Sequence, residues 1–294
     1  MIGGQSNSRG TNTEPTNLVW NTTDYIQSFC WMSQGCDANK FVPAQVPLFN
    51  ENNVGFSQTY ANLLLQTLPE NHGVILINTG VGGTGFFETG DWTAPNGKLV
   101  QQSVQAMQDL QTTFTKTLGG NISFHSMLWH QGEHDAGDNF GFWSADYCTY
   151  LMTDLSNLID YLRGTFQGAS AGTPFLDGGL LPYWVDQVNG TNGTAGVMDA
   201  IYGLNTSRVC TATADSRIFT DFLPDGVTPN GDPNARSGVS HDVIHFNSTQ
   251  AVLMGYQYWA AYQNAVKLTT TVPSARTQAC GGSSLTVDQC VSSL

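Results

Sequence analysis

The chain has 294 residues, and its 10 Lys and Arg against 23 Asp and Glu give a formal net charge of −13 at pH 7. A surface this acidic repels phosphate backbones and anionic lipids, so we expect neither nucleic-acid binding nor a polybasic membrane anchor. No apolar run reaches the roughly 18–20 residues of a membrane-spanning helix, so no membrane insertion is expected. Hydrophobic residues make up 40% of the chain, which is ample for one large core.

The hydrophobic pattern alternates short apolar runs with longer helical ones. It predicts strands at residues 74–77, 122–129, 174–181 and 217–222, and helices at residues 54–68, 99–118, 143–162, 197–209 and 248–266. Alternation of this kind predicts an α/β fold in three layers, with a mostly parallel sheet between two layers of helices. We interpret residues 1–267 as one domain and residues 268–294 as a tail.

The start of the chain does not fit this pattern well. A parallel sheet should open with an apolar strand, yet only Met1 and Ile2 precede the first glycines. We therefore expect a truncated first strand, either lost upstream or supplied by a neighbouring chain. The exposed sheet edge left by a short strand would allow the protein to associate with itself.

Few charges and many glycosylation sequons point to a secreted, extracellular glycoprotein. Charged residues make up 11% of the chain, against about 25% in an average soluble domain. Asn-x-Ser/Thr sequons, which mark candidate N-glycosylation sites, begin at Asn21, Asn121, Asn189, Asn192, Asn205 and Asn247.

The even number of cysteines fits an oxidising compartment, where three disulfides can form. The six are Cys30, Cys36, Cys148, Cys210, Cys280 and Cys290. Short spacing favours Cys30–Cys36 and Cys280–Cys290, the second of which would tie the tail, and this leaves Cys148–Cys210. The alternative is a set of buried thiols in a cytosolic protein.

Four loops at predicted strand ends carry residues suited to acyl transfer. They span residues 3–7, 80–84, 129–135 and 242–245, and loops at the carboxyl ends of strands hold the reactive groups of open α/β sheets. A serine hydroxyl needs a base to remove its proton, and a carboxylate must orient that base. Ser6, His245 and Asp242 can fill these three roles. The N–H groups of Ser6 and Gly83 and the amide of Gln131 can hold the oxyanion.

The interpretation of the third loop as a metal site is weaker than the acyl-transfer interpretation. Three histidines and two acids lie between residues 125 and 135, but their spacing does not match the His-Glu-x-x-His pattern of a zinc site. We therefore expect no metal and no other cofactor.

Taken together, the motifs resemble a known family. Gly-Gln-Ser-Asn, Gly-Gly-Thr, Trp-His-Gln-Gly-Glu-x-Asp and Asp-x-x-His follow one another over about residues 3–262. They are similar to those of the sialate O-acetylesterase-like branch of the SGNH (GDSL-type) hydrolases, which includes carbohydrate esterase family 6 and its acetylxylan esterases. The resemblance implies a flavodoxin-like α/β/α sandwich with a five-stranded sheet. It also implies a serine esterase that removes O-acetyl groups from a polysaccharide or from sialic acid.

Carried over by position, the resemblance assigns roles to individual residues. It implies Ser6 as nucleophile, His245 as base and Asp242 as the acid that orients it. Gly83 and Gln131 join the Ser6 amide in the oxyanion hole. The supporting residues are Gln5, Asn7 and Glu133, of which Glu133 corresponds to a buried acid that fixes the loops.

A second hypothesis belongs to a different class of protein. Low charge, dense sequons and a short first strand would also suit an extracellular structural or adhesive subunit that has kept a hydrolase fold. Intact catalytic motifs weigh against this alternative, because a purely structural protein needs no such set of residues.

Overall fold

The computed structural model describes residues 1–10, 24–31, 37–44, 55–87, 90–120, 122–137, 144–181, 192–218, 245–246 and 248–271. Its strands are β1 (Ile2–Gly4), β2 (Ile26–Cys30), β3 (Lys40–Pro43), β4 (Val74–Leu76), β5 (Met127–His130), β6 (Phe175–Gly178) and β7 (Thr211–Ala214). Its helices are α1 (Ser6–Arg9), α2 (Phe56–Leu65), α3 (Lys98–Leu118), α4 (Glu133–Gly137), α5 (Ser144–Thr165), α7 (Asn192–Ser207) and α8 (Ser248–Thr271), with a 3₁₀ turn, η1, at Ser216–Ile218.

The strands form two sheets that adjoin at β1. One has the order β1-β5-β6-β7 and the other β3-β2-β4. The Ile2 N–H donates to the Ile77 carbonyl at 2.8 Å, and the Thr79 N–H donates to the Ile2 carbonyl at 2.9 Å, which joins β1 to the end of β4. The combined order is β3-β2-β4-β1-β5-β6-β7, and every pair is parallel except β2–β3.

This arrangement confirms the predicted fold class. The five adjacent strands β4, β1, β5, β6 and β7, numbered among themselves in chain order, have the order 2-1-3-4-5 of flavodoxin-like folds. In such folds ligands bind where the strand order reverses. Here that point lies between β1 and β5. The strands β2 and β3, which the sequence pattern did not predict, extend the sheet at one side.

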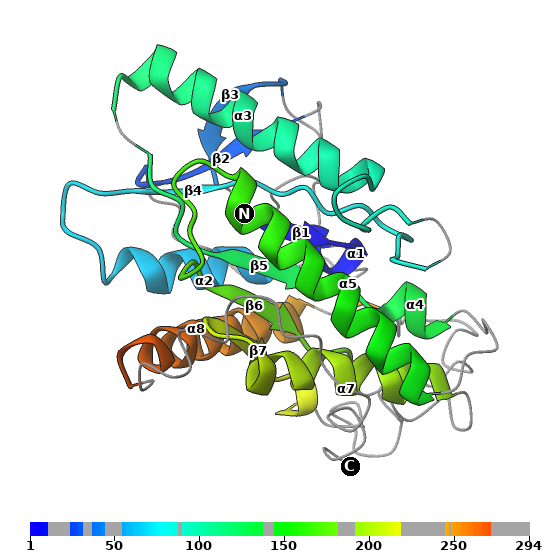
Figure 1. Ribbon diagram of the computed structural model, residues 1–294. Helices are drawn as coiled ribbons and strands as arrows, with labels where there is room; N and C mark the ends of the chain where they lie inside the picture. The colour runs from blue at the N-terminus through cyan, green and yellow to red at the C-terminus, as the bar shows by residue number, and fades with distance from the viewer. Residues whose placement is uncertain are drawn as a thin grey trace, which may run out of the picture.

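Helices cover both faces of the sheet, as Figure 1 shows. Side chains along β5 alternate between the faces. Met127 and Trp129 join a core with residues of α3, α5 and α7, whereas Leu128 joins a core with α2 and α8. The result is the predicted three-layer sandwich.

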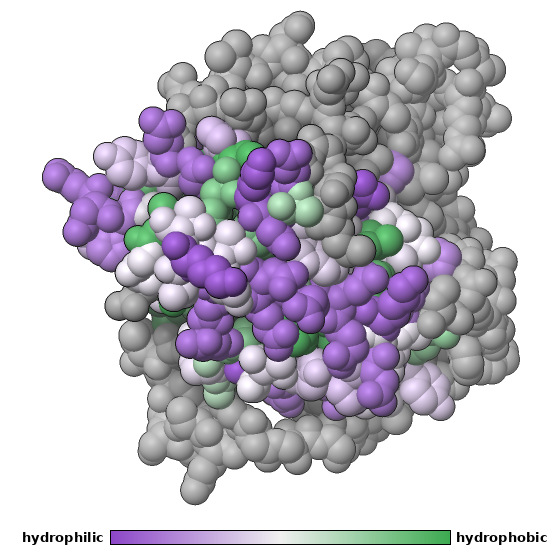
Figure 2. Space-filling view, turned by 90° about the horizontal axis from the view of Figure 1, so that it is seen from above, coloured by the Kyte–Doolittle hydropathy of each residue, from purple (hydrophilic) through white to green (hydrophobic). Residues whose placement is uncertain are grey.

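The surface over α3 is polar although the chain has few charged residues. Seen from above, the described surface is largely hydrophilic with small hydrophobic patches (Figure 2). On α3, the exposed residues include Gln101, Gln105, Gln108 and Lys116. Neutral amides therefore supply much of this polar surface. Among the described helices, none has the length and apolar character needed to cross a membrane.

The short first strand does not leave an exposed edge, contrary to our expectation. β1 lies between β4 and β5 in the middle of the sheet, and Ile2 is completely buried. Self-association through an edge at β1 therefore loses its structural basis.

One predicted strand is misplaced. Residues 217 and 218 belong to the 3₁₀ turn η1, and residues 219–222 lie outside the described part of the chain. The strand itself is β7, just before that turn, where the small residues Thr211–Ala214 pair with β6. The sequence pattern did not predict β7, because these residues form only a weak apolar pattern. Pairing with the buried strand β6 determines their conformation.

The predicted boundary between domain and tail falls inside a helix. We placed it between residues 267 and 268, but α8 continues to Thr271. Residues 272–294, including Cys280 and Cys290, lie outside the described part of the chain.

Cys210 corrects the expected disulfide pattern. It is a buried thiol outside any disulfide, so the pairing Cys148–Cys210 is wrong. That pairing rested on elimination alone. The pairings Cys30–Cys36 and Cys280–Cys290 stay predictions, because Cys36 also lies outside the described residues.

The structure also argues against one glycosylation site. Asn205 lies within α7, and its Nδ2 donates to Thr213 Oγ1 at 2.5 Å. Its amide nitrogen is thus already engaged between helix and sheet. Asn21, Asn121, Asn189 and Asn247 lie outside the described residues, and for Asn192 only the backbone is described.

Candidate active site

A sharp turn after β1 places Ser6 at the carboxyl edge of the sheet. Gly4 has φ +114°, and a Cβ there would collide with the carbonyl of His130, so this position requires glycine. The Gln5 N–H then donates to the same carbonyl at 3.0 Å. Ser6 begins α1 directly afterwards and is half-buried.

The second predicted loop lies beside Ser6. The Val81 N–H donates to the Gly4 carbonyl at 3.0 Å, and Asn78 Nδ2 donates to the Ser8 carbonyl at 2.8 Å. A Cβ built on Gly82 would be 3.5 Å from the Cβ of Ser6, while Gly82 and Gly83 are both exposed. The backbone of this loop is therefore open to solvent next to the candidate nucleophile.

A buried carboxylate joins the first and third loops. Glu133 is 1% exposed and begins α4, which follows β5. Its Oε2 accepts a hydrogen bond from Gln5 Nε2, and its Oε1 accepts one from Asn7 Nδ2 at 2.5 Å. The Nε2 of His130 lies 3.2 Å from the same Oε1. The expected supporting residues Gln5, Asn7 and Glu133 are thus in direct contact.

These partners keep Glu133 ionised in spite of its burial. Burial alone would raise the pKa of Glu133. The interaction with His130 and the hydrogen bond from Asn7 outweigh that effect, and the net pKa lies below its ordinary value of 4.5. The carboxylate is therefore a fixed negative charge that holds donors from two loops.

Asn7 extends the network to the other end of the chain. Its Nδ2 binds Glu133, and its Oδ1 accepts the backbone N–H of Phe246 at 3.0 Å. The ring of Phe246 packs edge-on against His130, with centroids 5.0 Å apart. His245 precedes this anchored residue and is half-buried. The buried hydrogen bond between Asn7 and Phe246 therefore joins the residues that follow Ser6 and His245 in the sequence. Asp242 lies outside the described residues.

The side chain of Gln131 is held by a second buried acid. Its Nε2 donates to Asp135 Oδ2 and lies 3.5 Å from the Thr84 carbonyl. Asp135 is completely buried and also accepts the N–H groups of Phe86 and Phe87. Burial raises the pKa of Asp135 to about 6, and these hydrogen bonds partly oppose the rise. Sequence reasoning gave Asp135 no role beyond its place in the third motif.

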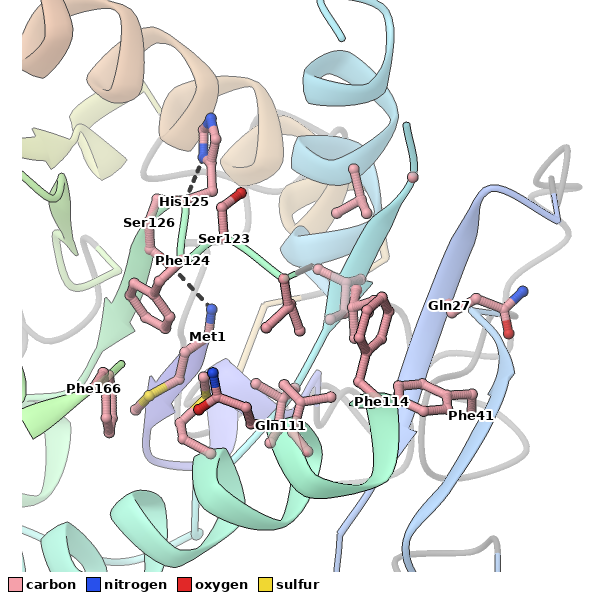
Figure 3. A pocket seen from close by; sticks show the side chains of 18 of the residues that line it. Met1, Gln27, Phe41, Gln111, Phe114, Ser123, Phe124, His125, Ser126 and Phe166 are labelled. Carbon is pink, nitrogen blue, oxygen red and sulfur yellow. Dashed lines mark hydrogen bonds between the residues drawn. The ribbon is translucent and has the colours of Figure 1, made fainter. Parts of the chain in front are cut away.

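One described cavity lies away from this edge. It encloses about 910 Å³ at the amino ends of β1, β4 and β5, and its lining includes Met1, Val74 and Ser126. Figure 3 shows Phe41, Phe114 and other aromatic side chains around it. The cavity contains none of the predicted site residues, so it does not locate the chemistry.

Within the described part of the chain, no group of three or more His, Cys, Asp or Glu side chains is arranged to hold a metal ion. His130 instead contacts Glu133 and the Tyr258 hydroxyl, the latter at 3.2 Å.

Comparison with known proteins identifies the family of this chain. Residues 1–169 match the family described as carbohydrate esterase, sialic acid-specific acetylesterase. This match covers more than half of the chain, which therefore belongs to that family. No curated protein matches the chain.

Two solved structures share the fold at low sequence identity. NanS superimposes with a TM-score of 0.61 at 15% identity, and a protein from Arabidopsis thaliana does so with a TM-score of 0.59 at 18% identity. In each case the match covers 90% of this chain and 96% of the other. The family makes this chain a carbohydrate acetylesterase, a class of hydrolase.

The Glu133 network predicts a large stability effect from an isosteric substitution. In Glu133→Gln, an amide nitrogen would face the donors of Gln5 or Asn7, and we expect the free energy of unfolding to fall by about 3 kcal/mol. Urea denaturation followed by circular dichroism measures this change. Glu70→Gln, at an exposed position, is the control and should change stability by less than about 0.5 kcal/mol.

The same pair of proteins gives a pH test. Because the pKa of Glu133 is lower in the folded state, its contribution to stability is present above pH 4.5 and is lost as the pH falls through the folded pKa. The stability difference between wild type and Glu133→Gln should shrink on acidification. A difference that grows toward low pH would contradict a lowered pKa.

Proposed function

We propose that the protein is a serine esterase that removes acetyl groups from a carbohydrate through an acetyl-enzyme intermediate, with Ser6 as nucleophile, His245 as base and Asp242 as the acid that orients His245. One observation carries the proposal: Asn7 binds both Glu133 and the backbone beside His245. That contact supports a site built from the two ends of the chain.

The proposed reaction has two steps. His245 takes the proton of Ser6 Oγ as this oxygen attacks the carbonyl carbon of the acetyl ester. The tetrahedral intermediate collapses, the C–O bond to the sugar breaks, and His245 returns the proton to the sugar oxygen. His245 then takes a proton from water as the water oxygen attacks the carbonyl carbon of the acetyl-enzyme. The bond from that carbon to Ser6 Oγ breaks, His245 returns the proton to Oγ, and acetate leaves.

The oxyanion of each intermediate needs donors that are fixed in advance. We assign this role to the N–H groups of Ser6 and Gly83 and to the amide of Gln131. The exposed Gly82–Gly83 backbone beside Ser6 supports this assignment. The orientation of Gln131 by Asp135 supports it further, because one Nε2 proton goes to the carboxylate and the other has only a long contact with Thr84.

The substrate class follows from the family, and the individual sugar is open between an acetylated polysaccharide and O-acetylated sialic acid. We further propose that the protein is secreted, as its sequons and cysteines indicate. The alternative of a structural or adhesive subunit is weaker. That hypothesis relied on an exposed sheet edge at β1, but β1 lies in the middle of the sheet.

Replacement of Ser6 tests the nucleophile. Ser6→Ala should lower kcat for 4-nitrophenyl acetate by at least about 10³-fold, because no other group can form the acetyl-enzyme. Ser170→Ala, at an exposed serine, should match the wild type. Hydrolysis by Ser6→Ala at the wild-type rate would refute the mechanism.

The pH profile tests the base. A general base acts only in its unprotonated form, so kcat/KM should fall as the pH drops from 8 to 5. Asp135 acts in the same direction: burial raises its pKa to about 6, and protonation at Oδ2 would replace the acceptor that Gln131 Nε2 contacts with an O–H donor. A rate that is constant across this range, with the fold intact by circular dichroism, would contradict both roles.

A further inference from the structure

Asp135 sits between two groups that the proposed reaction uses. Its Oδ1 accepts the Phe86 N–H at 3.0 Å and the Phe87 N–H at 3.3 Å, and its Oδ2 accepts from Gln131 Nε2. The first pair belongs to the loop that contains Gly83. The last belongs to the loop after β5. A single carboxylate thus joins both loops from which oxyanion donors are expected.

The packing around Asp135 leaves little freedom for either loop. Asp135 is completely buried, and a Cβ at Gly85 would collide with its Oδ1. The loop therefore approaches the carboxylate as closely as glycine allows. Thr84 is fixed as well, because its Oγ1 donates to the Val81 carbonyl at 2.7 Å and accepts from Trp92 Nε1 at 3.0 Å.

The carboxylate also decides which way the amide of Gln131 faces. An ionised carboxylate only accepts hydrogen bonds, so the amide must present its nitrogen to Asp135. Gln131 Oε1 is buried and finds no donor among the described residues. If an amide NH₂ group replaced the acceptor oxygen at residue 135, Gln131 could keep that contact only by turning its Oε1 toward it. The oxygen of Gln131 would then take the direction of the nitrogen that the oxyanion needs.

We propose that Asp135 is a positioning residue for the oxyanion hole: it fixes the backbone that follows Gly83 and imposes on Gln131 the orientation in which the amide donates. This inference rests on the proposed esterase function and adds to it a residue that does not touch the substrate. The chemical class of ligand that the arrangement serves is the tetrahedral oxyanion of an acetyl ester.

Asp135→Asn separates the two contacts. Asparagine keeps an oxygen for the Phe86 and Phe87 N–H groups but places an NH₂ group against Gln131. The amide of Gln131 should then turn over. We expect kcat for 4-nitrophenyl acetate to fall about 30-fold, less than the loss of a whole oxyanion donor, with KM changed by less than about twofold.

A double-mutant cycle with Gln131→Ala tests whether Asp135 acts through that amide. In the Gln131→Ala background, Asp135→Asn should lower kcat by less than about threefold, because the amide it positions is gone. Equal effects in both backgrounds would overturn the proposal, and so would wild-type kcat in Asp135→Asn. All variants are first shown to be folded by circular dichroism and urea denaturation.

Asp177→Asn is the matched control. Asp177 is also buried, at the carboxyl end of β6, and burial raises its pKa well above the ordinary value. Burial favours the neutral form of this carboxyl, which an amide matches in size and charge. Its kcat should stay within about twofold of wild type. A fall as large as that of Asp135→Asn would mean that any such change at this edge disturbs the site, and would overturn the proposal.

Ser6→Ala keeps the two levels of inference distinct. If that variant is inactive while Asp135→Asn is fully active, the esterase mechanism stands and the role of Asp135 fails. If Ser6→Ala is active, the mechanism itself fails.

Discussion

The structure depends on satisfying one buried negative charge. Moving a carboxylate out of water costs several kcal/mol, and the cost is offset only if donors surround it in good geometry. Glu133 draws those donors from Gln5 and Asn7 after β1 and lies beside His130 at the end of β5. Since Asn7 also binds the Phe246 N–H, segments more than 200 residues apart are held together around the same carboxylate.

Two acids in one short helix hold different parts of the site. Glu133 is linked to the loops of Ser6 and His245, whereas Asp135 is linked to Gln131 and the loop after Gly83. Their surroundings separate their titration: the pKa of Glu133 is lowered, and burial raises that of Asp135 to about 6. Neither acid needs to touch a substrate to affect the reaction. In the proposed mechanism both act on groups that do.

Much of the fold could be predicted because its signals are local. The helical pattern of residues 99–118 and the apolar run of residues 74–77 correspond closely to α3 and β4. β7 was misplaced because its conformation comes from pairing with β6 rather than from its own side chains. The central position of β1 was missed for the same reason: three residues carry too weak a pattern, and hydrogen bonds to both neighbours define the strand.

The candidate site residues were proposed from a set of motifs, but their contacts could not be predicted. Glycine, serine and histidine in loops indicate a reaction, whereas the bond from Asn7 to Phe246 spans 239 positions and leaves no trace in spacing. Asp135 stood within a motif, yet nothing in the sequence shows that it faces Gln131. The contact between Gln131 and Asp135 could have been predicted from their i, i+4 spacing, which brings the two side chains together at the start of α4.

Covalent labelling tests the central claim most directly, that a single activated serine lies at the edge where these loops meet. The intact protein is treated with a serine-directed fluorophosphonate, digested and mapped by mass spectrometry. The account predicts one phosphonylated peptide, modified at Ser6, and loss of that modification in His245→Ala. An unmodified Ser6 in the folded wild type, or labelling of Ser6 that does not depend on His245, would contradict it.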